Sequence, residues 1–394
     1  MANDINDEWL DAMIRHQIGL LRLSGKVRND VFDLLDATEK DIKDLIIKRL
    51  DKSRSVASQE RLIKAIAAIR SESWKKSSQV WRDEMLALVQ AEPALLATAL
   101  QTVAPVLLDT VLPNVDTLKA LVTHHPFEGR TLKDWSNQIA RADLQRIEQA
   151  IRIGVVQGEP TREIARRVVG SVNQRGKDGV TQITRRQAQA IARTAVNSYS
   201  NAAKREFYKA NADVFDREVY VATLDSRTTP VCRANDGKRF PVGKGPIPPL
   251  HWNCRSLRVA ELDGEVIGKR PAKAVTEKGL LRDYAKKAGI KPVGNRASLP
   301  RGHKGSFDQF SRGEIRKRTG VIDAKISYQD WLTRQPTSFQ IDILGPTRAK
   351  LFRDGNLKLD RFVNRRGDEL TLSQLARRDR DAFIAAGLDP DNFL

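Results

Sequence analysis

Residues that commonly build cross-links and metal centres are scarce in this chain. Its 394 residues include only 2 cysteines and 5 histidines. Two cysteines cannot staple a chain of this length, which excludes a secreted protein built on a disulfide framework. The patterns G-x-x-x-x-G-K-[ST], H-E-x-x-H and G-x-S-x-G are all missing. Their absence excludes a P-loop nucleotide hydrolase, a zincin protease and a serine hydrolase with a nucleophile elbow.

Long apolar runs are missing as well. The most apolar segment, residues 94–108 (ALLATALQTVAPVLL), is shorter than the ~18 apolar residues that a membrane-spanning helix needs, and Pro105 interrupts it. We interpret this segment as a buried helical hairpin or a partner-binding face. The first residues, MANDINDEWLDAM, are acidic and have no apolar core, so we expect no signal peptide. The sequence therefore predicts a cytoplasmically made protein with no membrane partner.

Acidic residues are too few to balance the basic ones. The chain has 68 Lys and Arg against 49 Asp and Glu, a formal net charge of +19. A surplus of this size attracts polyanions, and nucleic acid is the first candidate. The basic residues are scattered, which favours contact with a phosphate backbone over reading of a base sequence. A charge that serves only solubility, or an acidic protein partner, is the alternative interpretation.

Hydrophobic periodicity predicts a mainly helical α+β fold. Apolar residues recur at helical spacing through most of the first two hundred residues. A T-x-x-Q capping box at Thr184 and Gln187 predicts the start of a long helix there. Residues 217–224 and 256–262 alternate like strands and enclose a loop rich in proline and glycine. Further helix starts are predicted near the C-terminus, by capping signals at Ser327, Thr337 and Thr371.

These patterns divide the chain into four parts. Residues 1–129 form a helical N-terminal region, and residues 130–262 form a small α+β domain with a short sheet. Residues 263–305 are rich in Lys, Gly and Pro and predict an extended, mobile, basic linker. Residues 306–394 form a C-terminal helical unit.

Both cysteines lie in one stretch, residues 223–255, TLDSRTTPVCRANDGKRFPVGKGPIPPLHWNCR. His251 and Cys254 are spaced as a chelating turn, and Cys232 would join the two ends of the loop around one zinc ion. A structural zinc site needs four ligands. Asp225 or Asp236 would therefore have to supply the fourth.

Three other interpretations of this stretch stay open. A Cys232–Cys254 disulfide would close a loop of about twenty residues and contribute on the order of 3 kcal/mol. A Cys–His pair can also act as nucleophile and base. Finally, ordinary packing around Pro248 and Pro249 would make the loop rigid, with Arg255 paired to Asp225 or Asp236.

The order LDSRT, PVCRANDGKRF and PPLHWNCR resembles the signature of the phage Mu protein F-like family, the minor head or head-morphogenesis proteins of tailed bacteriophages. The helical segments RIEQAIRIGVVQGEPTREIARRV and QAIARTAVNSYSNAA are similar to the helices that precede this signature. The resemblance covers residues 130–262, about a third of the chain, as the head-morphogenesis domain. It assigns structural roles in the motif to Arg193, Asp225, Arg227, Asp236, Gly237, Pro249, Asn253 and Arg255.

The sequence departs from the family pattern at two positions. Many members carry C-P-x-C in the first turn, and Thr229 stands where the first cysteine would be. A site with four ligands in those members would therefore lack one ligand here. Ala195 follows the A-R-T run where a Glu is common. We expect Arg193, in that run, to reach toward the Asp225 loop.

The resemblance implies a minor capsid protein that is not an enzyme and that serves head morphogenesis. Such a protein would occupy the capsid interior or portal region of the virion, and the host cytoplasm during assembly. The implied partners are the portal protein, capsid and scaffold proteins, and packaged double-stranded DNA bound without sequence preference. Structural zinc is the one cofactor that the sequence suggests.

Two alternatives lie in other functional classes. One is a phage-encoded enzyme or toxin-like module that acts on nucleic acid and is packaged in the head. The other is a DNA-binding regulator with a helix-turn-helix at residues 159–170. The glycine-rich loop that follows residue 170 disfavours the second alternative.

Overall fold

The computed structural model describes residues 2–104, 109–171, 173–174, 176–262 and 269–394. Most of these residues are helical, and the described strands form two sheets of three strands each. The mainly helical α+β fold that the sequence predicts is confirmed.

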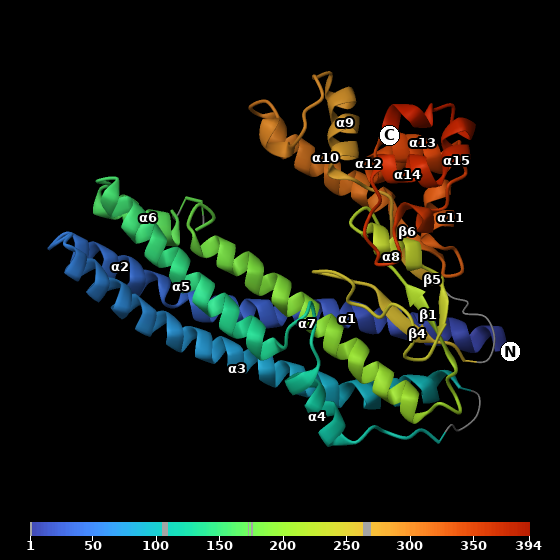
Figure 1. Cartoon of the computed structure of the whole chain (residues 1–394), viewed down its shortest axis with the longest axis horizontal. Helices are drawn as coiled ribbons and strands as arrows, with labels where there is room; N and C mark the ends of the chain where they lie inside the picture. The colour runs from blue at the N-terminus through green and yellow to red at the C-terminus, as the bar shows by residue number, and fades with distance from the viewer. Residues whose placement is uncertain (1, 105–108, 172, 175, 263–268) are drawn as a thin grey trace.

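An elongated helical bundle makes up the N-terminal half of the chain (Figure 1). Its long members are α1 (Ala2–Asp36), α3 (Val56–Val103), α5 (Leu132–Val156) and α7 (Thr181–Ala210). The short helices α2 (Glu39–Leu50) and α6 (Thr161–Val169) pack together at its far end, and α4 (Val115–His124) packs on α3. Apolar residues at helical spacing give each long helix a stripe that faces the shared core. The core includes Val27, Val31 and Leu35 of α1, Trp74 and Trp81 of α3, Ile139 of α5, and Ile191 and Tyr199 of α7.

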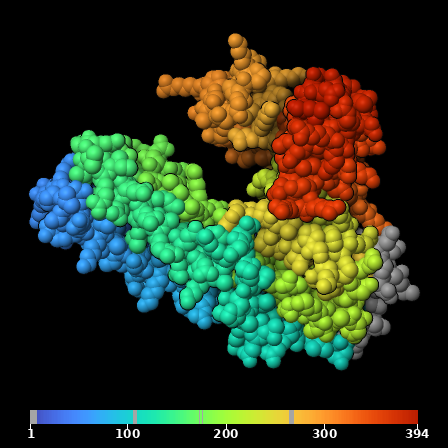
Figure 2. Space-filling model, in the orientation of Figure 1, coloured from blue at the N-terminus to red at the C-terminus, as the bar shows by residue number. Residues whose placement is uncertain are grey.

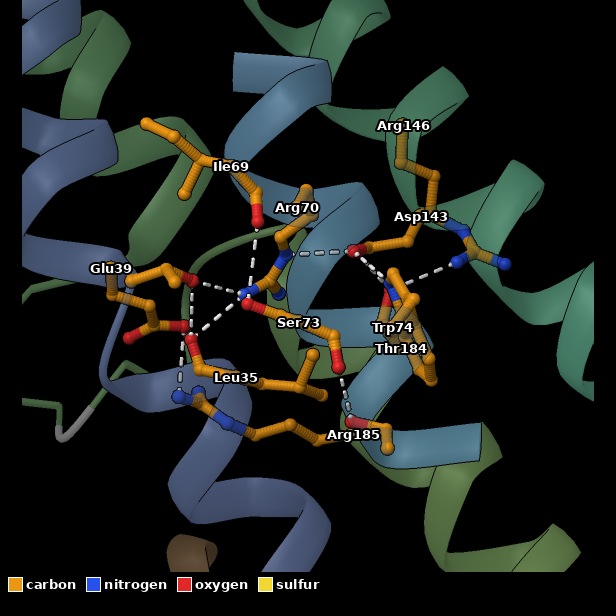
Figure 3. A network of polar contacts seen from close by, with 12 residues as sticks. Leu35, Glu39, Ile69, Arg70, Ser73, Trp74, Asp143, Arg146, Thr184 and Arg185 are labelled. Carbon is orange, nitrogen blue, oxygen red and sulfur yellow. Dashed lines mark hydrogen bonds and ion pairs between the residues drawn. The ribbon is translucent and has the colours of Figure 1, made fainter. Parts of the chain in front are cut away.

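A buried ion pair ties the long helices together inside the bundle (Figure 3). Arg70 of α3 donates to Asp143 of α5 at 2.8 Å, and each side chain is only 1% exposed. The same carboxylate accepts from the indole of Trp74 at 2.9 Å and from the hydroxyl of Thr184 on α7 at 2.8 Å. A buried charge is costly unless it is paired and hydrogen-bonded. These donors therefore favour one relative packing of α3, α5 and α7.

The predicted capping box at Thr184 and Gln187 is wrong. Helix α7 begins at Thr181, so Thr184 lies inside the helix rather than at its start. Its hydroxyl donates to Asp143 of the neighbouring helix, and Gln187 accepts from Arg146. Thr184 and Gln187 therefore form hydrogen bonds to a neighbouring helix, which the T-x-x-Q pattern alone does not predict.

The first sheet confirms both predicted strands. β1 (Arg217–Val221) lies between β3 (Arg239–Pro241) and β4 (Leu257–Ala260), and both pairings are antiparallel. Val219 and Val221 of β1, with Val259 of β4, pack against Phe207 and Tyr208 at the end of α7 and against Phe215, which precedes β1. The sheet is thus joined to the bundle by an apolar core.

The second sheet connects this domain to the C-terminal part of the chain. β2 (Leu224–Asp225) runs parallel to β5 (Lys269–Lys273), which pairs antiparallel with β6 (Thr319–Asp323). The short helix α8 (Pro230–Asn235) follows β2. β2 therefore places Asp225 where the two sheets meet the C-terminal unit.

The predicted extended linker over residues 263–305 is wrong for most of its length. β5 lies in the second sheet. Along the chain it is followed by α9 (Glu277–Ala288), the short helix η1 (Arg296–Ser298) and α10 (His303–Lys317), and α9 packs against α10. The reason is an apolar stripe on α9 that the basic composition obscured: Leu280, Leu281 and Tyr284 are buried beside Phe307. Residues 263–268 lie outside the described part of the chain. The division into four domains stays a prediction.

The C-terminal unit is a pack of short helices above the second sheet (Figure 1), and its red atoms form a compact lobe in Figure 2. Its members are α11 (Tyr328–Thr333), α12 (Thr337–Leu344), α13 (Pro346–Arg353), η2 (Leu359–Phe362), α14 (Leu372–Arg378), α15 (Arg380–Ala385) and η3 (Pro390–Phe393). Ser327 caps α11, and Thr371 with Gln374 forms a capping box on α14, as predicted. The predicted cap at Thr337 is wrong, because Pro336 precedes the first turn of α12.

The apolar segment at residues 94–108 is not a hairpin where the structure describes it. Residues 94–103 are the last turns of α3, where Leu96 and Leu100 are buried against the N-terminal part of α1 and the end of α7. Residues 105–108 lie outside the described part. Helix α3 contains a stretch long and apolar enough to cross a membrane by length and composition alone. Many core helices meet that criterion, and its buried residues face the bundle.

Candidate functional site

Both cysteines and His251 meet in one cluster, as the sequence predicts. Cys232 lies on α8, and His251 and Cys254 lie on the loop that leads into β4. The Sγ of Cys232 is 3.2 Å from Nε2 of His251 and 3.8 Å from Sγ of Cys254. Both sulfurs are buried, and the histidine is half-buried. The three ligand atoms all lie within 4.8 Å of one another.

The loop that carries His251 and Cys254 is held at several points. Arg258 of β4 donates to the carbonyl oxygens of Lys244 and Pro246, at 3.0 Å each. At the other end of the loop, Trp252 packs edge-on against Trp135 of α5, with ring centroids 4.8 Å apart. These contacts fix the loop to both the sheet and the bundle.

The cluster supplies three of the four ligands that a structural zinc site needs. Two sulfurs bound to one tetrahedral zinc ion, each at ~2.3 Å, lie about 3.8 Å apart, which matches Cys232 and Cys254. The other ring nitrogen of His251, Nδ1, is 2.9 Å from the carbonyl oxygen of Trp252. Such a bond from a zinc-binding histidine fixes its tautomer and leaves Nε2 free to coordinate. A zinc ion here would cross-link α8 to the loop before β4.

Neither aspartate that was predicted as a fourth ligand joins the cluster. Asp225 accepts from both terminal nitrogens of Arg255, at 2.6 and 2.8 Å. Asp236 accepts from Arg270 at 2.6 and 2.8 Å and from the backbone N–H of Ala222 at 2.7 Å. Arg255 and Arg270 therefore already use both carboxylates, and the prediction of a fourth aspartate ligand is wrong.

Thr229 lies where the fourth ligand is missing. It is the residue before α8 and stands three positions before Cys232. The buried Oγ1 atom has no hydrogen-bond partner in the described part of the chain. A cysteine at this position would present a sulfur to the cluster.

Without a metal, the cluster is a polarised pair of thiols beside an imidazole. The hydrogen bond from the Cys254 thiol, together with that of His251, lowers the pKa of Cys232 in spite of burial. The same bond, burial and the Cys232 charge raise the pKa of Cys254. The 3.8 Å between the sulfurs is well beyond the ~2.05 Å of a disulfide bond, and both cysteines are free in this structure.

The predicted structural residues surround the cluster. Gly237 has φ +77°, which a side chain would strain, and it follows Asp236 at the turn into β3. Pro249 follows Pro248 through a cis peptide bond, and Asn253 has φ +59° and donates its backbone N–H to Thr194. Arg227 donates its backbone N–H to Asp225 at 2.9 Å, while its side chain is 75% exposed.

Arg193 lies near the Asp225 loop but forms no ion pair with it among the described residues. Its guanidinium donates to the side-chain oxygen of Gln189 at 2.7 Å when that amide is oriented with its oxygen toward the arginine. Burial, together with the charges of Arg28, Arg227 and Arg255, lowers the pKa of Arg193. No carboxylate in the described part of the chain therefore contacts Arg193 to offset its positive charge.

Sequence reasoning missed three polar residues that support the cluster. Asn197 of α7 donates to the carbonyl oxygens of Cys254 at 3.2 Å and Ser256 at 3.3 Å. Gln17 of α1 donates in turn to Asn197 at 3.3 Å. Tyr220 of β1 donates its hydroxyl to the Cys232 sulfur at 3.2 Å. For Gln17 and Asn197, a polar residue on an apolar helix face is the signal that the sequence offers, whereas Tyr220 lies on a strand and has no such signal.

Comparison with known proteins places this site in a family domain. Residues 145–258 match the family model described as Phage Mu protein F like protein. The match runs from within α5 to within β4 and includes the whole Cys–His–Cys cluster. No curated protein and no solved structure gave a significant match.

Proposed function

From the premise that residues 145–258 form a phage Mu protein F-like domain, we propose that this chain is a minor head protein of a tailed bacteriophage. Its proposed role is head morphogenesis, in the capsid interior or at the portal. The match to the family is the observation that carries the proposal. The matched range contains every residue of the predicted motif, from Arg193 to Arg255.

The portal protein is the first proposed partner. Expression of the chain with an affinity-tagged portal protein from the same genome tests this contact. We expect the two proteins to co-purify through size exclusion, whereas the portal of a phage without such a domain, used as the control, should not retain the chain. Failure to co-purify, together with normal head assembly after deletion of the gene, would contradict the proposal.

Packaged DNA is the second proposed partner. The net charge of +19 supports contact with phosphate backbones. Binding that depends on released counterions falls steeply with salt and does not distinguish sequences. We expect the same affinity for two unrelated duplexes of equal length, and a steep loss of affinity between 50 and 200 mM salt. A strong preference for one duplex would instead support a DNA-binding regulator.

Zinc is proposed as a structural ion of the same domain. Cys232, His251 and Cys254 would hold it, and the spacing of their ligand atoms supports this assignment. Bound there, zinc would act as a cross-link, because it ties α8 to the loop before β4. Metal analysis of the purified chain, beside variants with each ligand replaced in turn, tests the proposal. A wild-type protein with no more zinc than the three variants would contradict it.

A further inference from the structure

A second feature of the domain is a pocket of about 470 Å³ beside the Cys–His–Cys cluster. Its walls come from α1, from α7, from the turn after β2 and from the loop before β4. Three arginines line it, Arg193, Arg227 and Arg255, and no carboxylate is among its lining residues. We call it the arginine pocket. It joins segments that are up to 238 residues apart in sequence, such as Gln17 and Arg255.

The charge around the arginine pocket is poorly balanced. Asp225 is the one carboxylate that forms ion pairs with these arginines among the described residues, and Arg255 and Arg227 share it. Within the described ranges, Arg193 donates to the neutral amide of Gln189 and forms no ion pair. Arg28 adds a further positive charge nearby and donates to another neutral group, Asn29. Neighbouring guanidinium groups that repel one another in this way favour the entry of an anion.

Two buried polar atoms of the pocket residues also lack partners. Gln17 is 8% exposed, and its side-chain oxygen has no hydrogen-bond partner in the described part of the chain. The hydroxyl of Thr229 is likewise buried and without a partner there. Buried polar atoms are usually satisfied. The Gln17 oxygen only accepts hydrogen bonds, so its partner would be water or a hydroxyl of the ligand rather than an anionic oxygen. The Thr229 hydroxyl is a suitable donor for an anion.

We propose that the arginine pocket binds a phosphate group carried by a nucleotide or by a nucleic-acid strand. A tetrahedral phosphate accepts hydrogen bonds from several directions, which suits three guanidinium groups around one space. The volume also exceeds that of a single carboxylate and lies in the usual range for small-molecule sites. Leu20, Leu21 and Trp252 supply an apolar wall, on which a sugar or base would pack. This inference does not depend on the role in head assembly.

Equilibrium binding to the purified full-length chain tests the proposal. The probe is a fluorescent deoxynucleoside triphosphate at constant ionic strength, with inorganic pyrophosphate and a short single-stranded oligonucleotide as separate competitors. We expect Arg193→Gln and Arg227→Gln each to weaken binding about tenfold, because each removes a charged hydrogen-bond donor. Arg82→Gln, on the exposed side of α3, is the matched control and should bind like the wild type.

Arg227 is the second test residue because its side chain is 75% exposed, so its replacement should leave the fold intact. Competition by pyrophosphate identifies a pocket for a small phosphate ligand, and competition by the oligonucleotide alone identifies a nucleic-acid phosphate. Both outcomes support the proposal. Equal binding by the wild type and both pocket variants would overturn it, as would an equal loss in Arg82→Gln. Displacement by an acidic peptide but by neither phosphate competitor would also overturn it, and would indicate a carboxylate ligand.

Discussion

Arg255 and Asp225 form a two-pronged ion pair between the loop before β4 and the end of β2. The carboxylate is 9% exposed and the guanidinium 18% exposed. Tyr328 of the C-terminal unit donates its hydroxyl to the backbone carbonyl of Asp225 at 2.8 Å. The same short segment therefore connects the Cys–His–Cys loop, the second sheet and the C-terminal unit.

The first prediction concerns the strength of this pair. Asp225→Asn should destabilise the chain by about 3 kcal/mol, because it leaves Arg255 partly buried without its counter-charge. Asp308→Asn is the control, since Asp308 pairs with Arg296 at an exposed site and exposed pairs contribute about 0–1 kcal/mol. Denaturant midpoints of the three proteins measure the effect. Equal midpoints for Asp225→Asn and the wild type would show that the pair is not important for stability.

The same pair predicts a pH dependence. Burial would raise the pKa of Asp225, but the hydrogen bonds and charge of Arg255 outweigh it and lower that pKa. A carboxyl whose folded pKa is depressed contributes stability that is present above its unfolded pKa of ~3.9 and is lost as the pH falls through the folded pKa. The stability gap between wild type and Asp225→Asn should therefore be constant from pH 7 to about pH 5 and shrink below about pH 4. A gap that grows on acidification would contradict this assignment.

A further prediction concerns zinc affinity and the residue at position 229. Thr229→Cys should supply the missing fourth zinc ligand beside Cys232 and tighten zinc binding on the order of 100-fold, since each ligand contributes roughly a quarter of the binding energy of a four-ligand site. Thr229→Ser keeps a hydroxyl and should bind zinc like the wild type. Competition with a chromophoric chelator measures both affinities. If the cysteine variant bound zinc no more tightly than the serine variant, residue 229 would not face the ion.

Asp143 gives a prediction for the bundle. Asp143→Ala removes the acceptor of Arg70, Trp74 and Thr184 and leaves a buried guanidinium unpaired, which should cost about 3–5 kcal/mol. Asp83→Ala, at an exposed position of α3, should change stability by no more than about 0.5 kcal/mol. Thermal unfolding followed by circular dichroism compares them. Similar melting temperatures for the two variants would mean that the network contributes little.

Local patterns predicted the parts of the structure that local forces decide. The alternation around Val219 and Val221 located β1, and Ser327 and Thr371 marked true helix starts. Thr184 fits the same capping pattern but lies within α7, because Asp143 of another helix accepts from its hydroxyl. A contact 41 residues away in sequence cannot be read from the local pattern.

The candidate site was predictable only in part, for a similar reason. Ligand chemistry was enough to group Cys232, His251 and Cys254, because few other side chains in the chain resemble them. It also suggested Asp225 and Asp236, whose arginine partners could not all be foreseen: Arg270 reaches Asp236 from a segment predicted to be a mobile linker. The arginine pocket could not be predicted, because it forms where α1 packs on α7 and residue spacing along the chain does not indicate that contact.

Purified phage heads offer the most direct measurement of the central claim, that this chain is a minor head protein. Heads would be prepared from three phage strains, in which the gene for this chain is intact, deleted, or deleted and complemented. Mass spectrometry would then quantify the proteins in the purified heads. We expect a few copies of the chain in wild-type and complemented heads, and a deficit of complete heads when the gene is deleted. Complete heads of normal number and infectivity without the chain, together with its absence from wild-type heads, would contradict the account.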